Sequence, residues 1–169
     1  AAALAEKIAS LTPGNLNKVY FANSGSVAND SAVRILHHYN NRLGRQKKKK
    51  ILSRMGAYHG STHLAIAMTT PAYSEGWDHA EGLVHHLKSP HHWREGDGMS
   101  ETEFCDALVQ DLKDSVERIG AENIAAFIAE PILSSGGIIE LPEGYLAALK
   151  LKCEERGMLL ILDEAQTGV

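Results

Sequence analysis

The chain has 169 residues, 44% of them hydrophobic and 22% charged, and carries a formal net charge of −4 at pH 7. This composition is typical of a globular protein, the length suits one domain, and the weak acidic charge indicates neither a nucleic-acid partner nor attraction to an acidic membrane. No apolar run approaches the roughly 20 residues that span a bilayer, and the first residues lack a signal-peptide pattern, so we expect no membrane partner.

The first half of the chain predicts short strands around one long helix. The opening residues AAALAEKIASL read as the end of a helix. A β-rich run, KVYFAN (18–23), predicts the first strand, and residues 25–44 predict the long helix. KKILSRM (49–55) and GLVHHL (82–87) predict the second and third strands, and the Gly- and Pro-rich surroundings of the third predict irregular loop.

The second half continues the alternation of helix and strand. Residues 100–120 predict a helix with an apolar stripe, and its opening SETE fits a capping box. NIAAFIAE (123–130) predicts the fourth strand. Residues 142–157 predict a further helix, with a proline near its start and a glycine after its end, and MLLILD (158–163) predicts the fifth strand.

Apolar strands that alternate with helices predict an α/β fold, in which a mostly parallel sheet lies between two helical layers. In such sheets ligands bind beyond the carboxyl ends of the strands. The candidate site residues are therefore those that follow the strands: Ser24–Ser26, Gly56–Gly60, Glu130 and Asp163–Gln166.

Two of these segments suggest ligand contacts. NSGSVAND lies between a strand and a helix, where small residues expose backbone amides at a helix N-terminus and can seat a phosphate; an ordinary helix cap is the alternative. GAYHGST follows the second strand, and Tyr58 and His59 could present an aromatic face to a planar ligand; a turn with a packed tyrosine is the alternative.

Metal and glycan sites are not predicted. His59 and His63 stand four residues apart, but neither the HExxH pattern nor a zinc set of cysteines completes a site. The two cysteines, Cys105 and Cys153, are far apart in the chain, which favours free thiols and a cytoplasmic location. Asn29 begins the sequon NDS, which we set aside because it falls inside the predicted helix.

The segment LLILDE has two interpretations. A hydrophobic strand ending in Asp–Glu fits the Walker B element of a P-loop ATPase, but the GxxxxGK[ST] loop that such an enzyme needs does not occur. In the second interpretation, Asp163 at the end of an apolar strand pairs with a ring nitrogen and keeps it protonated, as pyridoxal phosphate requires. A phosphate seat, an aromatic face and this carboxylate would then bind three parts of one cofactor.

Four motifs together resemble a known family. SGSVAND, GAYHGST, AFIAEPILSSGGIIELPEGY and LLILDEAQTGV are similar to the class III, omega-type aminotransferases, which use pyridoxal 5′-phosphate and have its fold type I. The resemblance covers nearly the whole chain. From Asn123 onward the sequence is especially similar to 2,2-dialkylglycine decarboxylase, a decarboxylating member, whereas the phosphate loop and Tyr58 resemble ordinary transaminases.

The resemblance implies a role for each candidate residue. Ser24, Gly25 and Ser26 would hold the cofactor phosphate. On the ring, the implied contacts are stacking by Tyr58, support from His59, a pairing of Asp163 with the ring nitrogen and a hydrogen bond from Gln166 to the ring hydroxyl oxygen. Asp163 and Glu130, which lies toward the substrate, are the implied catalytic residues.

The resemblance also implies an activity and a missing part. The full-length enzyme would be a homodimer that transfers an amino group from an amine or omega-amino acid to a 2-oxo acid. Decarboxylation-coupled transamination and a non-catalytic relative are the alternatives, with the P-loop ATPase more distant. We expect residues 1–169 to form a single partial domain, which is a fragment of the family's large, cofactor-binding domain. The family's catalytic lysine would lie beyond it, so these residues alone would be inactive.

Overall fold

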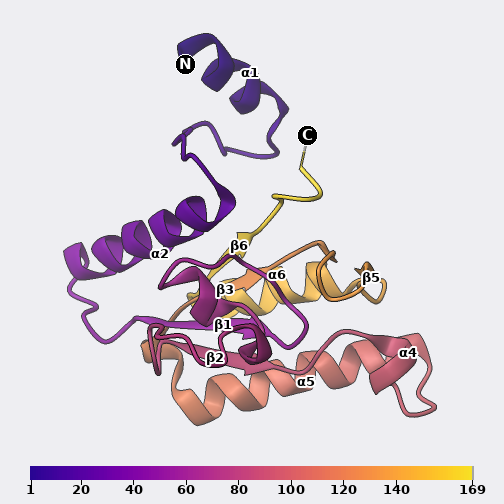
Figure 1. The fold of residues 1–169 in the computed structure, drawn as a ribbon. Coiled ribbons are helices and arrows are strands. Elements are labelled where there is room, and N and C mark those ends of the chain that lie inside the picture. Colours follow the sequence, from indigo (N-terminus) through magenta and orange to yellow (C-terminus); the bar gives the residue numbers. More distant parts are fainter. Residues whose placement is uncertain (169) are drawn as a thin grey trace.

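The computed structural model describes residues 1–168; Val169, the last residue of the LLILDEAQTGV motif, lies outside the described residues. Its centre is a parallel sheet with the strand order β2-β1-β3-β6 (Figure 1). These strands are β1 (Lys50–Arg54), β2 (Val84–Leu87), β3 (Ile124–Ala129) and β6 (Leu159–Leu162). The second to fifth predicted strands are thereby confirmed, each within a few residues of its expected bounds.

Helices cover both faces of this sheet. Helices α5 (Glu101–Ile119) and α6 (Tyr145–Glu155) pack on one face, and α2 (Gly25–Arg42) and the short α3 (Ala65–Met68) pack on the other (Figure 1). Successive strand residues supply the two cores: Phe127 packs with α5 and α6, whereas its neighbour Ile128 packs with α2 and α3. This arrangement confirms the predicted three-layer α/β/α fold with a parallel sheet.

Smaller elements complete the fold. Helix α1 (Ala2–Leu11) has no buried residue and stands apart from the sheet (Figure 1). A two-stranded antiparallel hairpin, β4 (Ile132–Leu133) with β5 (Ile139–Glu140), lies between β3 and α6 in the chain. The remaining elements are short: η1 (Pro71–Tyr73), α4 (His92–Glu95) and η2 (Ala121–Asn123). No helix within residues 1–168 is long and apolar enough to cross a membrane.

Helix α5 begins as its sequence predicts. The Ser100 hydroxyl oxygen accepts the Glu103 N–H, and the Glu103 carboxylate accepts the Ser100 N–H at 2.8 Å, which completes the capping box. These bonds pair two of the amide groups that a helix start otherwise leaves unpaired. The helix ends at Gly120, whose φ of 86° suits glycine. Between these ends the helix buries Phe104 and the leucines that follow it against the sheet.

Two predicted elements differ in the structure. Residues 18–23 form no strand, so that prediction was wrong: Tyr20 and Phe21 are 68% and 46% exposed, and the segment has no neighbouring strand to accept its backbone hydrogen bonds. Helix α6 begins at Tyr145 rather than at Pro142, because Gly144 caps it in a left-handed conformation with φ of 78°.

The fold predicts a sharp difference between two leucines of α6. Leu149 is fully buried between the helix and the sheet, whereas Leu151 on the same helix is 52% exposed. We expect Leu149→Ala to lower the free energy of unfolding by about 2–5 kcal/mol, because it leaves a cavity, and Leu151→Ala to change it by less than about 0.5 kcal/mol. Urea unfolding of both variants beside the parent chain measures this; equal effects would contradict the packing.

Candidate active site

A cavity of about 240 Å³ lies at the carboxyl edge of the sheet. Gly25 and Ser26 reach it from the start of α2, and Tyr58 and His59 reach it from the loop after β1. Glu130 follows β3, and Asp163 and Gln166 follow β6. Seven of the eight residues to which the resemblance gave a role therefore line one cavity, at the place where parallel sheets bind ligands.

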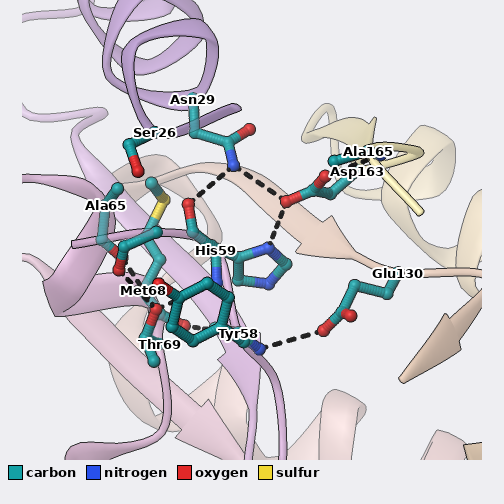
Figure 2. Close-up of polar contacts among 12 residues, drawn as sticks. Ser26, Asn29, Tyr58, His59, Ala65, Met68, Thr69, Glu130, Asp163 and Ala165 are labelled. Atoms are coloured by element: carbon teal, nitrogen blue, oxygen red, sulfur yellow. Dashed lines mark hydrogen bonds and ion pairs between the residues drawn. The ribbon is translucent and has the colours of Figure 1, made fainter. Parts of the chain in front are cut away.

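The side chain of Asp163 accepts three hydrogen bonds at the edge of this cavity. Its Oδ2 accepts hydrogen bonds from Nδ1 of His59 and Nδ2 of Asn29, both at 2.8 Å, and its Oδ1 accepts the Ala165 N–H at 3.2 Å (Figure 2). Burial by itself would raise the pKa of Asp163, but the bonds from His59 and Asn29 outweigh it, and the pKa lies below its ordinary value. Asp163 is therefore a carboxylate at neutral pH and can only accept hydrogen bonds.

His59 is fixed in orientation by this carboxylate. Because Asp163 can only accept, the hydrogen between them belongs to Nδ1 of His59. The histidine backbone N–H donates to Oγ1 of Thr69 at 2.9 Å, which holds the loop from the other side. Within residues 1–168, the buried Nε2 atom of His59 has no hydrogen-bond partner. The ring therefore keeps one nitrogen free beneath the cavity.

Tyr58 is the aromatic group that remains accessible. Its side chain is 38% exposed, and its ring meets Tyr73 edge-on with the centroids 5.7 Å apart and the planes at 75°. Tyr73 therefore packs against the Tyr58 ring, and the exposed part of the ring remains available to a planar ligand. The Tyr58 backbone N–H donates to Oε1 of Glu130 at 3.0 Å (Figure 2), so the same loop also positions the second carboxylate.

Glu130 is the second carboxyl of the cavity, and it is buried. Only 5% of the residue is exposed, and burial raises the pKa of its carboxyl although the Tyr58 N–H opposes this. Its backbone carbonyl accepts a hydrogen bond from Nη2 of Arg54 at 2.7 Å. Arg54 itself is fully buried, with its guanidinium carbon 5.9 Å from the centre of the Tyr145 ring, and burial lowers its pKa. This buried cation therefore holds the backbone of Glu130 in place.

The start of α2 is built as a compact turn. Ser24 is the N-cap, and its Oγ accepts the Val27 N–H at 3.2 Å; Ser24 borders a neighbouring hollow and not the cavity itself. Oγ of Ser26 accepts the Ser61 N–H at 3.2 Å, which joins α2 to the loop after β1. This contact requires Gly60, whose φ is 121° and whose missing Cβ leaves room for Ser26.

Two residues of the cavity, Asn29 and Ser135, were not among the candidates, and two candidates, Gly60 and Ala165, had been given no role. Asn29 bridges His59 and Asp163, and Gly60, Ser135 and Ala165 also line the cavity. Gly60 lies in the GAYHGST segment after the second predicted strand, so the sequence indicated it. The bridging role of Asn29 could not be found from the sequence, because its partners are distant in the chain.

A larger hollow, of about 620 Å³, lies elsewhere. It is bordered by residues that precede β1, β3 and β6, at the opposite edge of the sheet, and its side chains do not converge on one point through hydrogen bonds. Volume alone favours it, but the fold and the polar contacts favour the smaller cavity as the functional site. No group of three potential metal ligands occurs within residues 1–168.

Comparison with known proteins gives consistent matches. The family model described as Aminotransferase class-III matches residues 1–169. A probable gamma-aminobutyrate transaminase 2, mitochondrial, from Oryza sativa subsp. indica is 41% identical over 168 residues, which cover 98% of this chain and 34% of the relative.

Solved structures agree with this. An (S)-enantioselective omega-transaminase from Thermomicrobium roseum has a TM-score of 0.92 at 40% identity, over 95% of this chain and 36% of that one. The PMP-bound form of an aminotransferase from Vibrio fluvialis has a TM-score of 0.92 at 35% identity, over 96% of this chain and 36% of that one.

The close approach at Gly60 generates a prediction. A Cβ atom there would lie 2.9 Å from Cα of Ser26 and closer still to its hydroxyl, in a backbone conformation that only glycine adopts easily. We expect Gly60→Ala to destabilise the chain by about 3 kcal/mol, because strain and overlap add. Gly76→Ala is the control: its φ is 78° but nothing lies within 4 Å, so it should cost about 1 kcal/mol. Thermal unfolding compares them, and equal losses would contradict the contact with Ser26.

Proposed function

We propose a function for this chain from one premise: it belongs to the class III aminotransferase family. The family is dependent on pyridoxal 5′-phosphate. We propose that the cavity beside Asp163 binds this cofactor and that the whole protein transfers an amino group from an amine or omega-amino acid to a 2-oxo acid. The observation that carries the proposal is the ionised, triply hydrogen-bonded carboxylate of Asp163 in a cavity that also holds the start of α2.

The extent of the chain limits what it can do by itself. It spans about a third of the length of the curated relatives that it matches. We therefore propose that residues 1–169 are part of a larger cofactor-binding domain, and that the catalytic lysine and the partner contacts of a homodimer come from other parts of the whole protein. The cytoplasmic location stays a prediction.

Asp163 fits the ring nitrogen of the cofactor. A protonated pyridine nitrogen is a cationic donor, and Asp163 is an anionic acceptor whose low pKa keeps it charged. When bound, the cofactor withdraws electrons from the substrate through this protonated ring. The task of Asp163 is to keep the proton on the ring nitrogen, and the task of His59 is to hold the carboxylate that does so.

The start of α2 fits the cofactor phosphate. The first amides of a helix have no intrahelical partner and lie at the positive end of the helix dipole. Gly25 and Ser26 contribute such amides beside the cavity, and Ser24 caps the same turn. We propose that these amides hold the phosphate, because glycine lets an anion approach the backbone closely. Ser24 then shapes the turn through its bond to Val27 as well as contributing a hydroxyl.

Three further residues complete the proposed site. The exposed ring of Tyr58 would stack on the cofactor ring, a contact of about 1 kcal/mol. Gln166 lines the cavity within three residues of Asp163 and would hydrogen-bond the ring hydroxyl oxygen. Glu130, with its raised pKa, would face the substrate.

Decarboxylation-coupled transamination is the second candidate. It is favoured by the resemblance of the sequence from Asn123 onward to 2,2-dialkylglycine decarboxylase, whereas the matched relatives named above are transaminases. Release of carbon dioxide from a 2,2-dialkylglycine by the full-length protein would favour this candidate. The P-loop ATPase is not supported, because the class III aminotransferase match covers residues 1–169 and the GxxxxGK[ST] loop does not occur in them.

The function is tested on the full-length protein loaded with pyridoxal phosphate. We expect a visible absorption band that an omega-amino acid such as 4-aminobutyrate bleaches and that a 2-oxo acid restores. Asp163→Asn should lower kcat/KM about ten- to hundredfold, because a hydrogen bond to a charged group contributes about 1.5–3 kcal/mol.

The neighbouring carboxylate provides the matched control. Glu164 is exposed, and its side chain bonds only to Thr167 within residues 1–168, so Glu164→Gln should keep kcat/KM within about threefold of the parent. A protein that forms no band, or an Asp163→Asn variant with full activity, would contradict the proposal.

A further inference from the structure

Asn29 is a polar side chain buried on the inner face of α2. The residue is only 7% exposed, and it lies on the same side of the helix as the buried Val33 and Leu36. An unpaired amide at such a position would lower the stability of the fold, so the hydrogen bonds of Asn29 indicate its role. Both bonds run out of the helix, to segments that follow β1 and β6.

These two bonds form a bridge across the site. Nδ2 of Asn29 donates to the backbone carbonyl oxygen of His59 at 2.9 Å and to Oδ2 of Asp163 at 2.8 Å (Figure 2). An amide NH₂ group has two hydrogens, so both are used. The bridge joins the first turns of α2 to the loop that carries Tyr58 and to the carboxylate at the end of β6.

The bridge constrains the orientation of Asp163. His59 and Asn29 both donate to Oδ2, whereas Oδ1 accepts only the longer bond from the Ala165 N–H. Two donors on one oxygen fix the rotation of the carboxylate about its Cβ–Cγ bond. Without Asn29, the carboxylate would keep one short bond, from His59 to Oδ2, and the longer Ala165 bond to Oδ1, so its rotation would be less restrained.

We propose that Asn29 is a positioning residue that acts through Asp163: it fixes the carboxylate in the orientation that receives the ring nitrogen. The effect on the cofactor rests on the proposed function, whereas the hydrogen bonds of Asn29 are observed in this chain. A neutral donor is required at this position. A carboxylate would repel Asp163, and an apolar side chain would leave the Asp163 and His59 oxygens with one donor fewer.

The same helix contains a matched control. Asn40 is also buried, at 2% exposure, on the same face of α2, but its Nδ2 donates only to the Leu36 carbonyl within its own helix, at 3.2 Å. Substitution of Asn40 removes a buried amide without touching the site. A purely structural role for Asn29 predicts equal effects at the two positions, whereas the positioning role predicts that only Asn29 affects Asp163.

The first test needs no cofactor. In the cofactor-free full-length protein, carboxyl carbon NMR follows the titration of Asp163. Removing a donor from its charged form disfavours that form, so Asn29→Ala should raise the pKa of Asp163, and Asn29→Asp should raise it further because two adjacent carboxyls cannot both ionise readily. Asn40→Ala should leave it unchanged. An unchanged titration in Asn29→Ala would overturn the proposal.

The parent protein supplies a readout that no folding defect can obscure. The side-chain amide signals of Asn29 should shift with the midpoint of the Asp163 titration, and those of Asn40 should not. If the chemical shifts of the Asn29 side-chain amide do not change with the Asp163 titration, the proposal is overturned, even if the variants do not fold.

The second test uses the loaded enzyme. We expect Asn29→Ala to weaken pyridoxal phosphate binding about tenfold, measured by the visible band, with Asn40→Ala unchanged. If the parent protein binds no cofactor, the proposed function fails, and the cofactor-free titration still tests whether Asn29 acts on Asp163. If the parent binds the cofactor and Asn29→Ala binds it equally well, the inference fails and the proposed function stands.

Discussion

The site depends on one carboxylate oxygen, Oδ2 of Asp163. It accepts hydrogen bonds from the side chains of Asn29 and His59, which lie 134 and 104 residues earlier in the chain. A carboxylate taken out of water would ordinarily gain a proton, because burial penalises its charge. The two charge-assisted bonds reverse that tendency and keep the pKa low. A fixed negative charge therefore stands at the end of a hydrophobic strand, and the helix α2 and the loop after β1 are held against it.

The sheet topology makes this convergence possible. Strands β1, β3 and β6 are parallel neighbours, so the segments that follow them leave the sheet at one edge. Ala129 pairs with Leu162, and the Asp163 N–H donates to the Ala129 carbonyl at 2.8 Å, which extends the ladder to the first residue of the site. Backbone hydrogen bonds thus fix where Asp163 lies, and its side-chain bonds fix how it is oriented.

Much of this arrangement could be predicted from the sequence, because apolar runs locate the strands and functional residues directly follow them. Asp163 and Glu130 were found in that way. The run at 18–23 shows the limit: its β-rich composition gives a preference, but a strand also needs a neighbour, which composition does not reveal. Asn29 shows a second limit, because its role depends on partners 30 and 134 residues away, whereas its own segment indicates a helix start and a phosphate seat but no contact with Asp163.

The two carboxyls of the cavity differ for a physical reason. Asp163 receives three hydrogen bonds, two of them from side chains, and its pKa falls. Glu130 is buried, and burial raises the pKa of its carboxyl although the Tyr58 N–H and the neighbouring His59 both oppose this rise. Environments that shift the pKa values of two acids in opposite directions suit them to different roles. Burial raises the pKa of Glu130, whereas hydrogen bonds lower the pKa of Asp163, so one cavity contains two carboxyls whose pKa values are shifted in opposite directions.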